Sequence, residues 1–157
     1  MKTNIGITEK NTKHSISILE TLLSNEMILY VKTRRAHWNI SGESFMELHK
    51  LFQSHYSELE ESIDAIAERI GKLGHKTIGT MSEFLKLATL KEHTGKDHIT
   101  KDILHELLKD HESVVVELRE SILQYNEKNN DLGTVDFLTG LMQQHETTAW
   151  ILRRYLH

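Results

Sequence analysis

The chain has 157 residues, the size of a single domain that buries a substantial hydrophobic core. It contains no cysteine, which excludes disulfides, thiolate ligands, iron–sulfur clusters and cysteine nucleophiles, so any bound metal must sit on nitrogen and oxygen. The absence of proline and a charged fraction of 27% predict an all-α fold, and the formal net charge of −4 disfavours binding to phosphate backbones.

The N-terminal sequence MKTNIGITEK lacks the apolar core of a secretory signal. No apolar run approaches the roughly eighteen residues of a membrane span. We therefore expect a cytoplasmic protein with no membrane partner. Residues 1–8 are predicted to form a flexible arm, and residues 9–157 a single domain.

A first helix is predicted to start after Thr8, a residue that favours the position before a helix. Apolar residues at spacings of three and four define its inner face, which comprises Ile16, Leu19, Leu23, Met27 and Tyr30. The same stripe continues to His37. A lone histidine on such a stripe is more often a hydrogen-bonded core residue than a ligand, so His37 acquires meaning only from residues further along.

A second helix should run to about Leu73, after a break at Ser41 and Gly42 and with Ser44 or Ser41 as its cap. Its predicted core seam comprises Phe45, Leu48, Phe52, Leu59, Ile63, Ile66 and Ile70. The adjoining stripe of polar residues comprises His49, Gln53, Glu60, Asp64 and Glu68. This polar stripe is predicted to face a partner.

The residue types on this stripe indicate a metal site, because imidazole with carboxylate is a ligand set for iron, zinc or manganese. His49 and Asp64 are about 22 Å apart along a helix, at about 1.5 Å of rise per residue, so they cannot bind one ion within one chain. They nevertheless lie within about 60° of each other around the helix. Two chains packed antiparallel would bring the histidine end of one against the acidic end of the other. The pattern predicts two shared sites in a two-fold dimer.

The stretch that begins at Arg35 resembles the Dps-type mini-ferritins, which carry HWN, then G, F and LH, and then D with AER one turn later. The matching residues are His37, Trp38, Asn39, Gly42, Phe45, Leu48, His49, Asp64, Ala67, Glu68 and Arg69. The resemblance implies a ferritin-like four-helix bundle and a dodecameric shell built on two-fold dimers. It also implies a ferroxidase-type oxidoreductase that oxidises Fe(II) to Fe(III) with hydrogen peroxide, stores the ferric mineral and limits oxidative damage.

By this resemblance His37 and His49 of one subunit, with Asp64 and Glu68 of another, are the catalytic metal ligands. Iron is the expected metal, with zinc or manganese as possible substitutes. The family usually has an acid one turn after the second histidine, where this chain has Gln53, so the second metal position is expected to be weak.

Trp38 follows a predicted ligand directly in sequence. We expect it either to intercept radicals or to anchor the subunit interface through its aromatic ring.

The segment from Gly71 to Lys96 is predicted to be a long crossover between the second and third helices, as in ferritin-like bundles. It contains a short amphipathic piece, SEFLKLATL, and Thr80 and Glu83 have the spacing of a capping box at its start. A short helix is therefore expected within the crossover.

The third helix is predicted from about Thr100 to Glu127 and the fourth from about Thr134 to Tyr155. The fourth is expected to place on its core face Leu138, Leu141, Met142, Ala149, Trp150 and Leu152. His111 and His145 fall near these stripes, and we favour a polar layer or a subunit boundary over a second metal site. The other histidines expected at the surface are His14, His75, His93, His98 and His157.

Asp131 and Asp136 resemble the acids that line a three-fold iron-entry pore in the family. An equally good interpretation is a helix N-terminus, where an acid complements the helix dipole.

DNA binding and a purely structural role are the two alternatives to iron handling. Family members that coat DNA often use lysine-rich arms, whereas this arm offers only Lys2, Lys10 and Lys13, so DNA binding is expected to be weak or absent. A purely structural bundle dimer leaves the histidines and acids of the stripe unexplained.

Overall fold

The computed structural model describes residues 3–95, 99–125 and 129–157. These residues form five helices and no strand, which confirms the predicted all-α fold: α1 Glu9–Asn39, α2 Phe45–Lys72, α3 Met81–Leu87, α4 Thr100–Gln124 and α5 Leu132–Arg154. Predictions that involve Lys2, Lys96, His98 and Glu127 lie outside the described residues.

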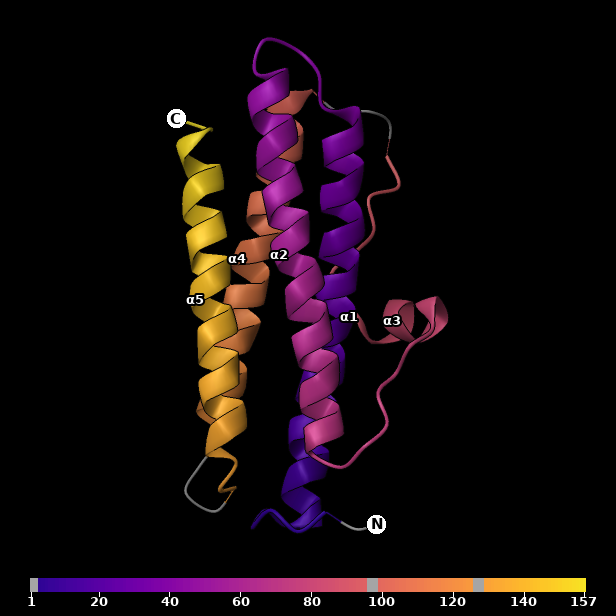
Figure 1. Ribbon diagram of the computed structural model, residues 1–157. Coiled ribbons are helices and arrows are strands. Elements are labelled where there is room, and N and C mark those ends of the chain that lie inside the picture. The colour runs from indigo at the N-terminus through magenta and orange to yellow at the C-terminus, as the bar shows by residue number, and fades with distance from the viewer. Residues whose placement is uncertain (1–2, 96–98, 126–128) are drawn as a thin grey trace.

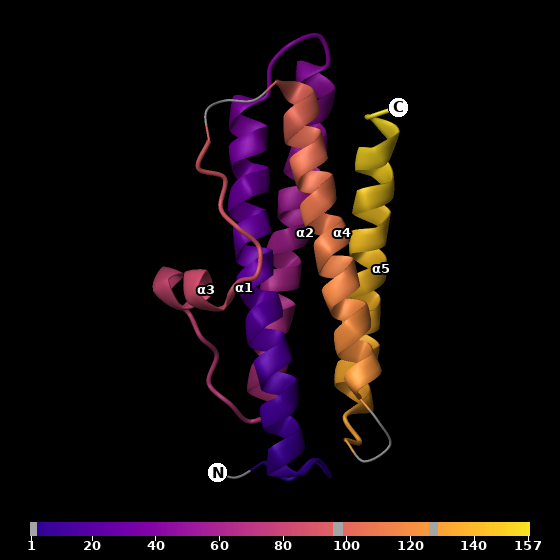
Figure 2. The same ribbon diagram turned by 180° about the vertical axis from the view of Figure 1, so that it is seen from behind.

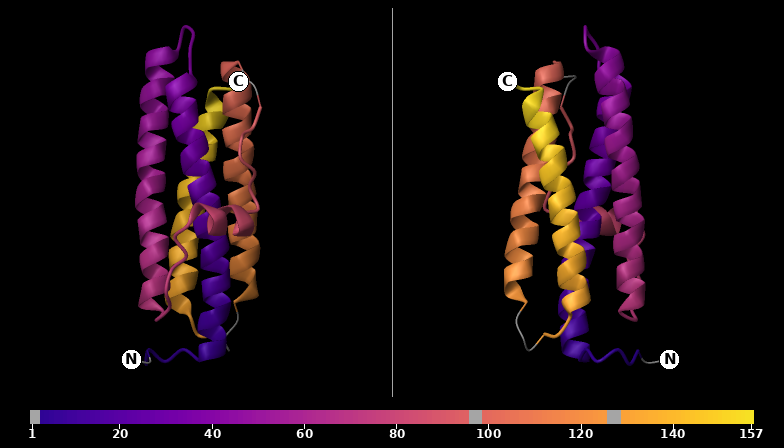
Figure 3. Two further views of the ribbon diagram at one scale, coloured as in Figure 1. Left: turned by 90° about the vertical axis from the view of Figure 1, so that its right-hand side faces the viewer. Right: turned by 60° about the vertical axis from the view of Figure 1, so that its left-hand side comes forward.

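The four long helices form two antiparallel pairs, α1 with α2 and α4 with α5 (Figure 1). Because α2 and α4 run in the same direction, the chain between them must travel the length of the bundle, and this crossover carries α3 (Figure 2). The short helix lies across α1 when the bundle is seen from the side (Figure 3). The predicted long crossover with its own short helix is confirmed.

Local capping explains where three of the helices begin. Thr8 accepts a hydrogen bond from the Asn11 backbone amide at 3.3 Å, and Thr80 with Glu83 forms a complete capping box at the start of α3. Asp131 caps α5, which therefore starts two residues before the predicted Thr134. Ser44 occupies the cap position of α2 but makes no side-chain capping bond, so that part of the prediction was wrong.

Most predicted core residues are buried or half-buried, but two are exposed. Phe45 is 38% exposed and Trp150 is 53% exposed. Phe45 is the first residue of α2. Trp150 lies one residue after the buried Ala149, so it is rotated by about 100° away from the core face. Both therefore project from the surface of the single chain.

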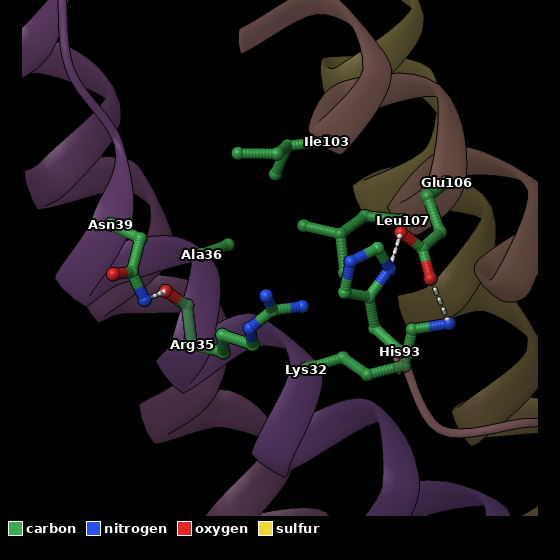
Figure 4. Close-up of a pocket in the computed structure, with 8 residues that line it drawn as sticks. All are labelled: Lys32, Arg35, Ala36, Asn39, His93, Ile103, Glu106 and Leu107. Carbon is green, nitrogen blue, oxygen red and sulfur yellow. Dashed lines mark hydrogen bonds and ion pairs between the residues drawn. The ribbon is translucent and has the colours of Figure 1, made fainter. Parts of the chain in front are cut away.

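The upper part of the crossover is held to the bundle by an ion-pair cluster (Figure 4). The buried Lys32 of α1 pairs with Glu106 of α4 at 2.7 Å and with Asp110, and it donates to the backbone carbonyl of Lys91 at 3.1 Å. His93 Nδ1 lies 2.8 Å from Glu106, and its side chain is only 11% exposed. The prediction of a surface His93 was therefore wrong, because the crossover folds back onto α4.

Two other histidines predicted at the surface are half-buried, and one is exposed. His14 packs on Tyr125, with 5.5 Å between ring centroids, and His75 is also half-buried. His157 is exposed as predicted.

No helix within the described ranges combines the length and the apolar character that a membrane crossing requires.

Candidate metal centre

The two predicted histidine ligands come together where α1 ends and α2 begins. The rings of His37 and His49 stack with 3.7 Å between their centroids and 18° between their planes. His37 is 9% exposed and His49 is half-buried. The antiparallel packing of α1 on α2 places side by side two residues that are twelve positions apart in the chain.

Each of these rings is fixed by the backbone of the other helix. His37 Nδ1 lies 2.7 Å from the carbonyl oxygen of His49, and His49 Nδ1 lies 2.8 Å from the carbonyl oxygen of His37. A carbonyl oxygen only accepts hydrogen bonds, so both Nδ1 atoms must carry the proton. In the neutral form of each ring, the lone pair is then on Nε2, the atom through which such a ring can bind a metal ion.

Aromatic neighbours restrict the two rings further. Tyr56 meets His37 edge to face, with 5.3 Å between centroids, and Phe45 lies on His49 at 5.0 Å. The half-exposed Phe45, misplaced in the predicted core, thus packs against a predicted ligand.

The predicted acidic ligands lie at the other end of α2. Asp64 and Glu68 are both exposed, and Glu68 pairs with Lys72 at 3.0 Å on the helix surface. The separation of Asp64 from His49 along α2 is about 22 Å. Across the ranges that the structure describes, no three His, Asp or Glu side chains are grouped as ligands of one ion. The chain brings the histidines together and leaves the acids apart.

Gln53 and Trp38 occupy the surroundings of the histidine pair. Gln53 is exposed one helical turn after His49. Trp38 is 63% exposed, and the Arg34 guanidinium lies 5.4 Å from its ring centroid. Trp38 therefore points to the surface rather than into the bundle.

Asp131 does not have the environment expected of a pore residue. Its side chain is fully buried, accepts hydrogen bonds from Ser15 Oγ at 2.6 Å and from the Thr134 backbone amide at 3.1 Å, and pairs with Arg69 at 2.9 Å. Burial raises the pKa of Asp131, but these hydrogen bonds and the Arg69 charge outweigh it and hold the pKa below its usual value. A carboxylate enclosed in this way cannot face a channel, so for Asp131 the helix-cap interpretation holds. Asp136 is exposed.

The chain matches the ferritin-like domain family over residues 16–157. It is 31% identical over 145 residues to DNA protection during starvation protein 2 of Bacillus anthracis, covering 92% of this chain and 98% of the relative. The chain belongs to the Dps proteins of the ferritin-like family.

Two further similarities cover nearly all of the chain. A Dps protein of Vibrio cholerae, described as a member of a broad superfamily of ferritin-like diiron-carboxylate proteins, has a solved structure with a TM-score of 0.90. It is 31% identical and covers 100% of this chain and 98% of its own. An uncharacterized low temperature-induced protein of Nostoc sp. is 43% identical over 153 residues, covering 98% of this chain and 86% of the relative. At the level of the family, the function is that of an iron-storing mini-ferritin or of DNA protection.

The buried polar residues that the sequence analysis did not predict include one acid and one histidine with a recognisable sequence signal. Glu26 is fully buried on α1 and His55 is 4% exposed on α2. A signal was present, because Glu26 falls at three-and-four spacing between Leu23 and Tyr30, and His55 likewise falls between Phe52 and Leu59.

Proposed function

We propose that this Dps protein oxidises Fe(II) at sites shared between two chains and stores the ferric product inside a twelve-chain shell. His37 and His49 of one chain bind the ion through Nε2. Asp64 and Glu68 of the facing chain supply the negative charge. The observation that carries the proposal is the pair of fixed imidazoles whose Nε2 atoms are free of the carbonyl hydrogen bonds.

The ligand chemistry favours oxidation of the bound ion. Two imidazole nitrogens and two carboxylates stabilise Fe(III) more than they stabilise Fe(II), because the carboxylates offset the higher charge. Loss of an electron from the bound ion therefore becomes easier than in water. Hydrogen peroxide is the proposed oxidant. Two Fe(II) ions each lose one electron, and one peroxide accepts both as its O–O bond breaks and two hydroxide ions form.

The preorganised histidine pair lowers the cost of binding. Each ring already has the tautomer and orientation that the metal requires, because the other helix's backbone accepts its Nδ1 proton. The acids need no such support within the chain, since both lie on the exposed side of α2 where a partner can meet them.

A matched pair of substitutions tests the acidic half of the site. Asp64→Asn keeps the shape of the side chain but removes the charge, and it should slow Fe(II) oxidation by at least about tenfold. Glu60→Gln, one turn earlier on the same helix and also exposed, removes a charge without removing a proposed ligand, so its rate should match the parent's. Equal rates for all three proteins would count against the proposal.

Sharing between chains is tested by mixing two inactive variants. Shells that combine His37→Ala/His49→Ala chains with Asp64→Asn/Glu68→Gln chains contain dimers with one intact site. They should recover part of the oxidation rate. No recovery in shells shown by mass spectrometry to be mixed would contradict a shared site.

A further inference from the structure

Two tyrosines lie next to the histidine pair, one on each of the two helices that carry it. Tyr30 precedes His37 by seven residues on α1, and Tyr56 follows His49 by seven residues on α2. Seven residues are about two helical turns, so each tyrosine points within about 20° of the direction of its histidine. Because α1 and α2 are antiparallel, both tyrosines lie on the same side of the histidine pair. Their rings meet edge to face, with 6.3 Å between centroids.

Tyr56 packs directly on a proposed metal ligand. Its ring meets the His37 ring at 80° with 5.3 Å between centroids, a separation typical of contacting aromatic rings. Trp38, the residue first considered for a redox role, is 63% exposed and projects to the surface. Phe45 lies on His49, but a phenyl ring is much harder to oxidise than a phenol. Tyr56 therefore places an oxidisable side chain in contact with the histidine pair.

A cation lies against the two tyrosine rings. The Arg34 guanidinium carbon is 4.5 Å from the ring centroid of Tyr56 and 5.4 Å from that of Tyr30. Arg34 Nη1 also donates a hydrogen bond to the Tyr30 hydroxyl at 2.8 Å, which fixes the guanidinium in place. A cation is attracted to the face of a neutral ring but repels a ring that has become positive. Oxidation of Tyr56 should therefore release the hydroxyl proton and leave a neutral radical.

The proposed chemistry requires a second electron donor at this site. Hydrogen peroxide accepts two electrons when its O–O bond breaks, whereas one bound Fe(II) supplies only one. Gln53 lies one turn after His49, and its uncharged amide cannot offset a second ferric ion as a carboxylate would. A site that holds one Fe(II) must take the other electron from the protein, or it releases a hydroxyl radical.

We propose that Tyr56 supplies this second electron, an inference that rests on the proposed oxidation of Fe(II) at the histidine pair. In the first step Fe(II) loses one electron, and the Tyr56 hydroxyl loses one electron and its proton. Peroxide accepts both electrons and the proton as its O–O bond breaks, which gives one hydroxide ion and one water molecule.

A second step restores Tyr56. The next Fe(II) ion gives one electron to the neutral Tyr56 radical and a water molecule gives the proton, which leaves Fe(III) and a second hydroxide ion. The two steps together oxidise two Fe(II) ions for each peroxide and release no hydroxyl radical.

Freeze-quench electron paramagnetic resonance of the assembled protein tests this role. One Fe(II) per chain is bound anaerobically and then mixed with one hydrogen peroxide per chain. We expect a tyrosyl radical whose signal narrows in protein that contains ring-deuterated tyrosine and disappears when a second Fe(II) per chain is added. A signal that deuterated tyrosine leaves unchanged would assign the radical to another residue type and overturn the proposal.

Tyr56→Phe removes the hydroxyl and keeps the ring that packs on His37. This variant should lose the radical signal, and a spin trap in solution should capture hydroxyl radicals that the parent does not release. Its anaerobic Fe(II) affinity should match the parent's, because no proposed ligand is changed. Tyr125→Phe makes the same change at the end of α4, beside Ser15 of α1, and should behave like the parent. Equal radical signals and equal spin-trap yields in the two variants would contradict the role of Tyr56.

The amount of Fe(III) formed in the same samples separates this inference from the proposed function. No Fe(III) in the parent would contradict both the oxidation at the histidine pair and the role of Tyr56. Fe(III) formation without a tyrosyl radical would contradict the role of Tyr56 alone.

Discussion

His37 and His49 each have the Nδ1 proton committed to a carbonyl oxygen of the other helix. The choice of tautomer is thus made by the packing of α1 on α2 before any metal arrives. No sequence pattern could show this, because the contact depends on the register of two helices that is known only once they are packed. Sequence patterns did predict that His37 and His49 belong to the same site.

Gln53, the single departure from the family pattern, predicts how strongly the second metal position binds. Its amide oxygen can coordinate iron but carries no charge, so it cannot offset a second ferric ion as a carboxylate would. We expect one firmly bound metal and a weak second position. Gln53→Asp should strengthen that second position and speed the early phase of oxidation when iron is limiting.

Anaerobic titration of Fe(II) into the parent and the Gln53→Asp protein measures this difference. The exposed Gln143→Asp, on α5, controls for added negative charge away from the site. If the parent and Gln53→Asp show the same stoichiometry and the same second-site affinity, Gln53 does not weaken the second position.

Asp131 connects three helices. It caps α5, accepts a hydrogen bond from Ser15 of α1, and pairs with Arg69 of α2. Asp131→Ala should lower the free energy of unfolding by about 3 kcal/mol, since it removes a cap and leaves buried donors without a partner. Asp136→Ala, at a nearby exposed position, should change it by no more than about 0.5 kcal/mol. Urea unfolding of both variants measures the difference, and equal losses would contradict the structural role of Asp131.

The same carboxylate predicts a pH dependence. Because the folded chain holds the pKa of Asp131 below that of the unfolded chain, its contribution is fully present above the unfolded pKa of about 4 and is lost as pH falls through the folded pKa. The stability difference between the parent and Asp131→Asn should therefore shrink as pH is lowered below about 4. A difference that stays constant from pH 7 to the acid limit would show that the charge of Asp131 contributes nothing.

Helical periodicity and capping residues predicted most elements correctly. Thr8 and the Thr80–Glu83 box start helices where expected, and the long crossover follows from the parallel direction of α2 and α4. The fourth long helix was predicted from Thr134 but begins at Leu132, because Asp131, for which a pore and a helix N-terminus were equally good interpretations, is its cap. Capping acids and channel acids look alike in sequence, and only burial distinguishes them.

The buried polar layer was predicted only in part. His111 and His145 were expected near the core, and the structure places them in contact there. Glu26 and His55 were not part of the prediction, although each interrupts an apolar stripe at helical spacing. A charged or ionisable residue on such a stripe is a useful signal of a buried polar site.

The charge distribution of the whole molecule predicts weak DNA binding. The net charge is −4, and in the N-terminal region Lys13 is paired with Glu9 at 3.0 Å. We expect no retardation of duplex DNA in a gel at pH 7, moderate salt and micromolar protein. A complex that forms under these conditions and weakens steeply with added salt would reverse the ranking of DNA protection below iron handling.

The proposed metal site is one that no single chain completes. His49 lies near one end of α2, and Asp64 and Glu68 lie near the other. If both halves bind one ion as proposed, a two-fold partner must bring them together. On this proposal, Fe(II) oxidation depends on assembly.

Anomalous diffraction at the iron edge, from crystals of the assembled protein soaked anaerobically in Fe(II), tests this claim most directly. We expect an iron peak within bonding distance of His37 and His49 of one chain and of Asp64 and Glu68 of its two-fold neighbour. Iron bound entirely by residues of one chain, or no peak beside the His37–His49 pair, would contradict it.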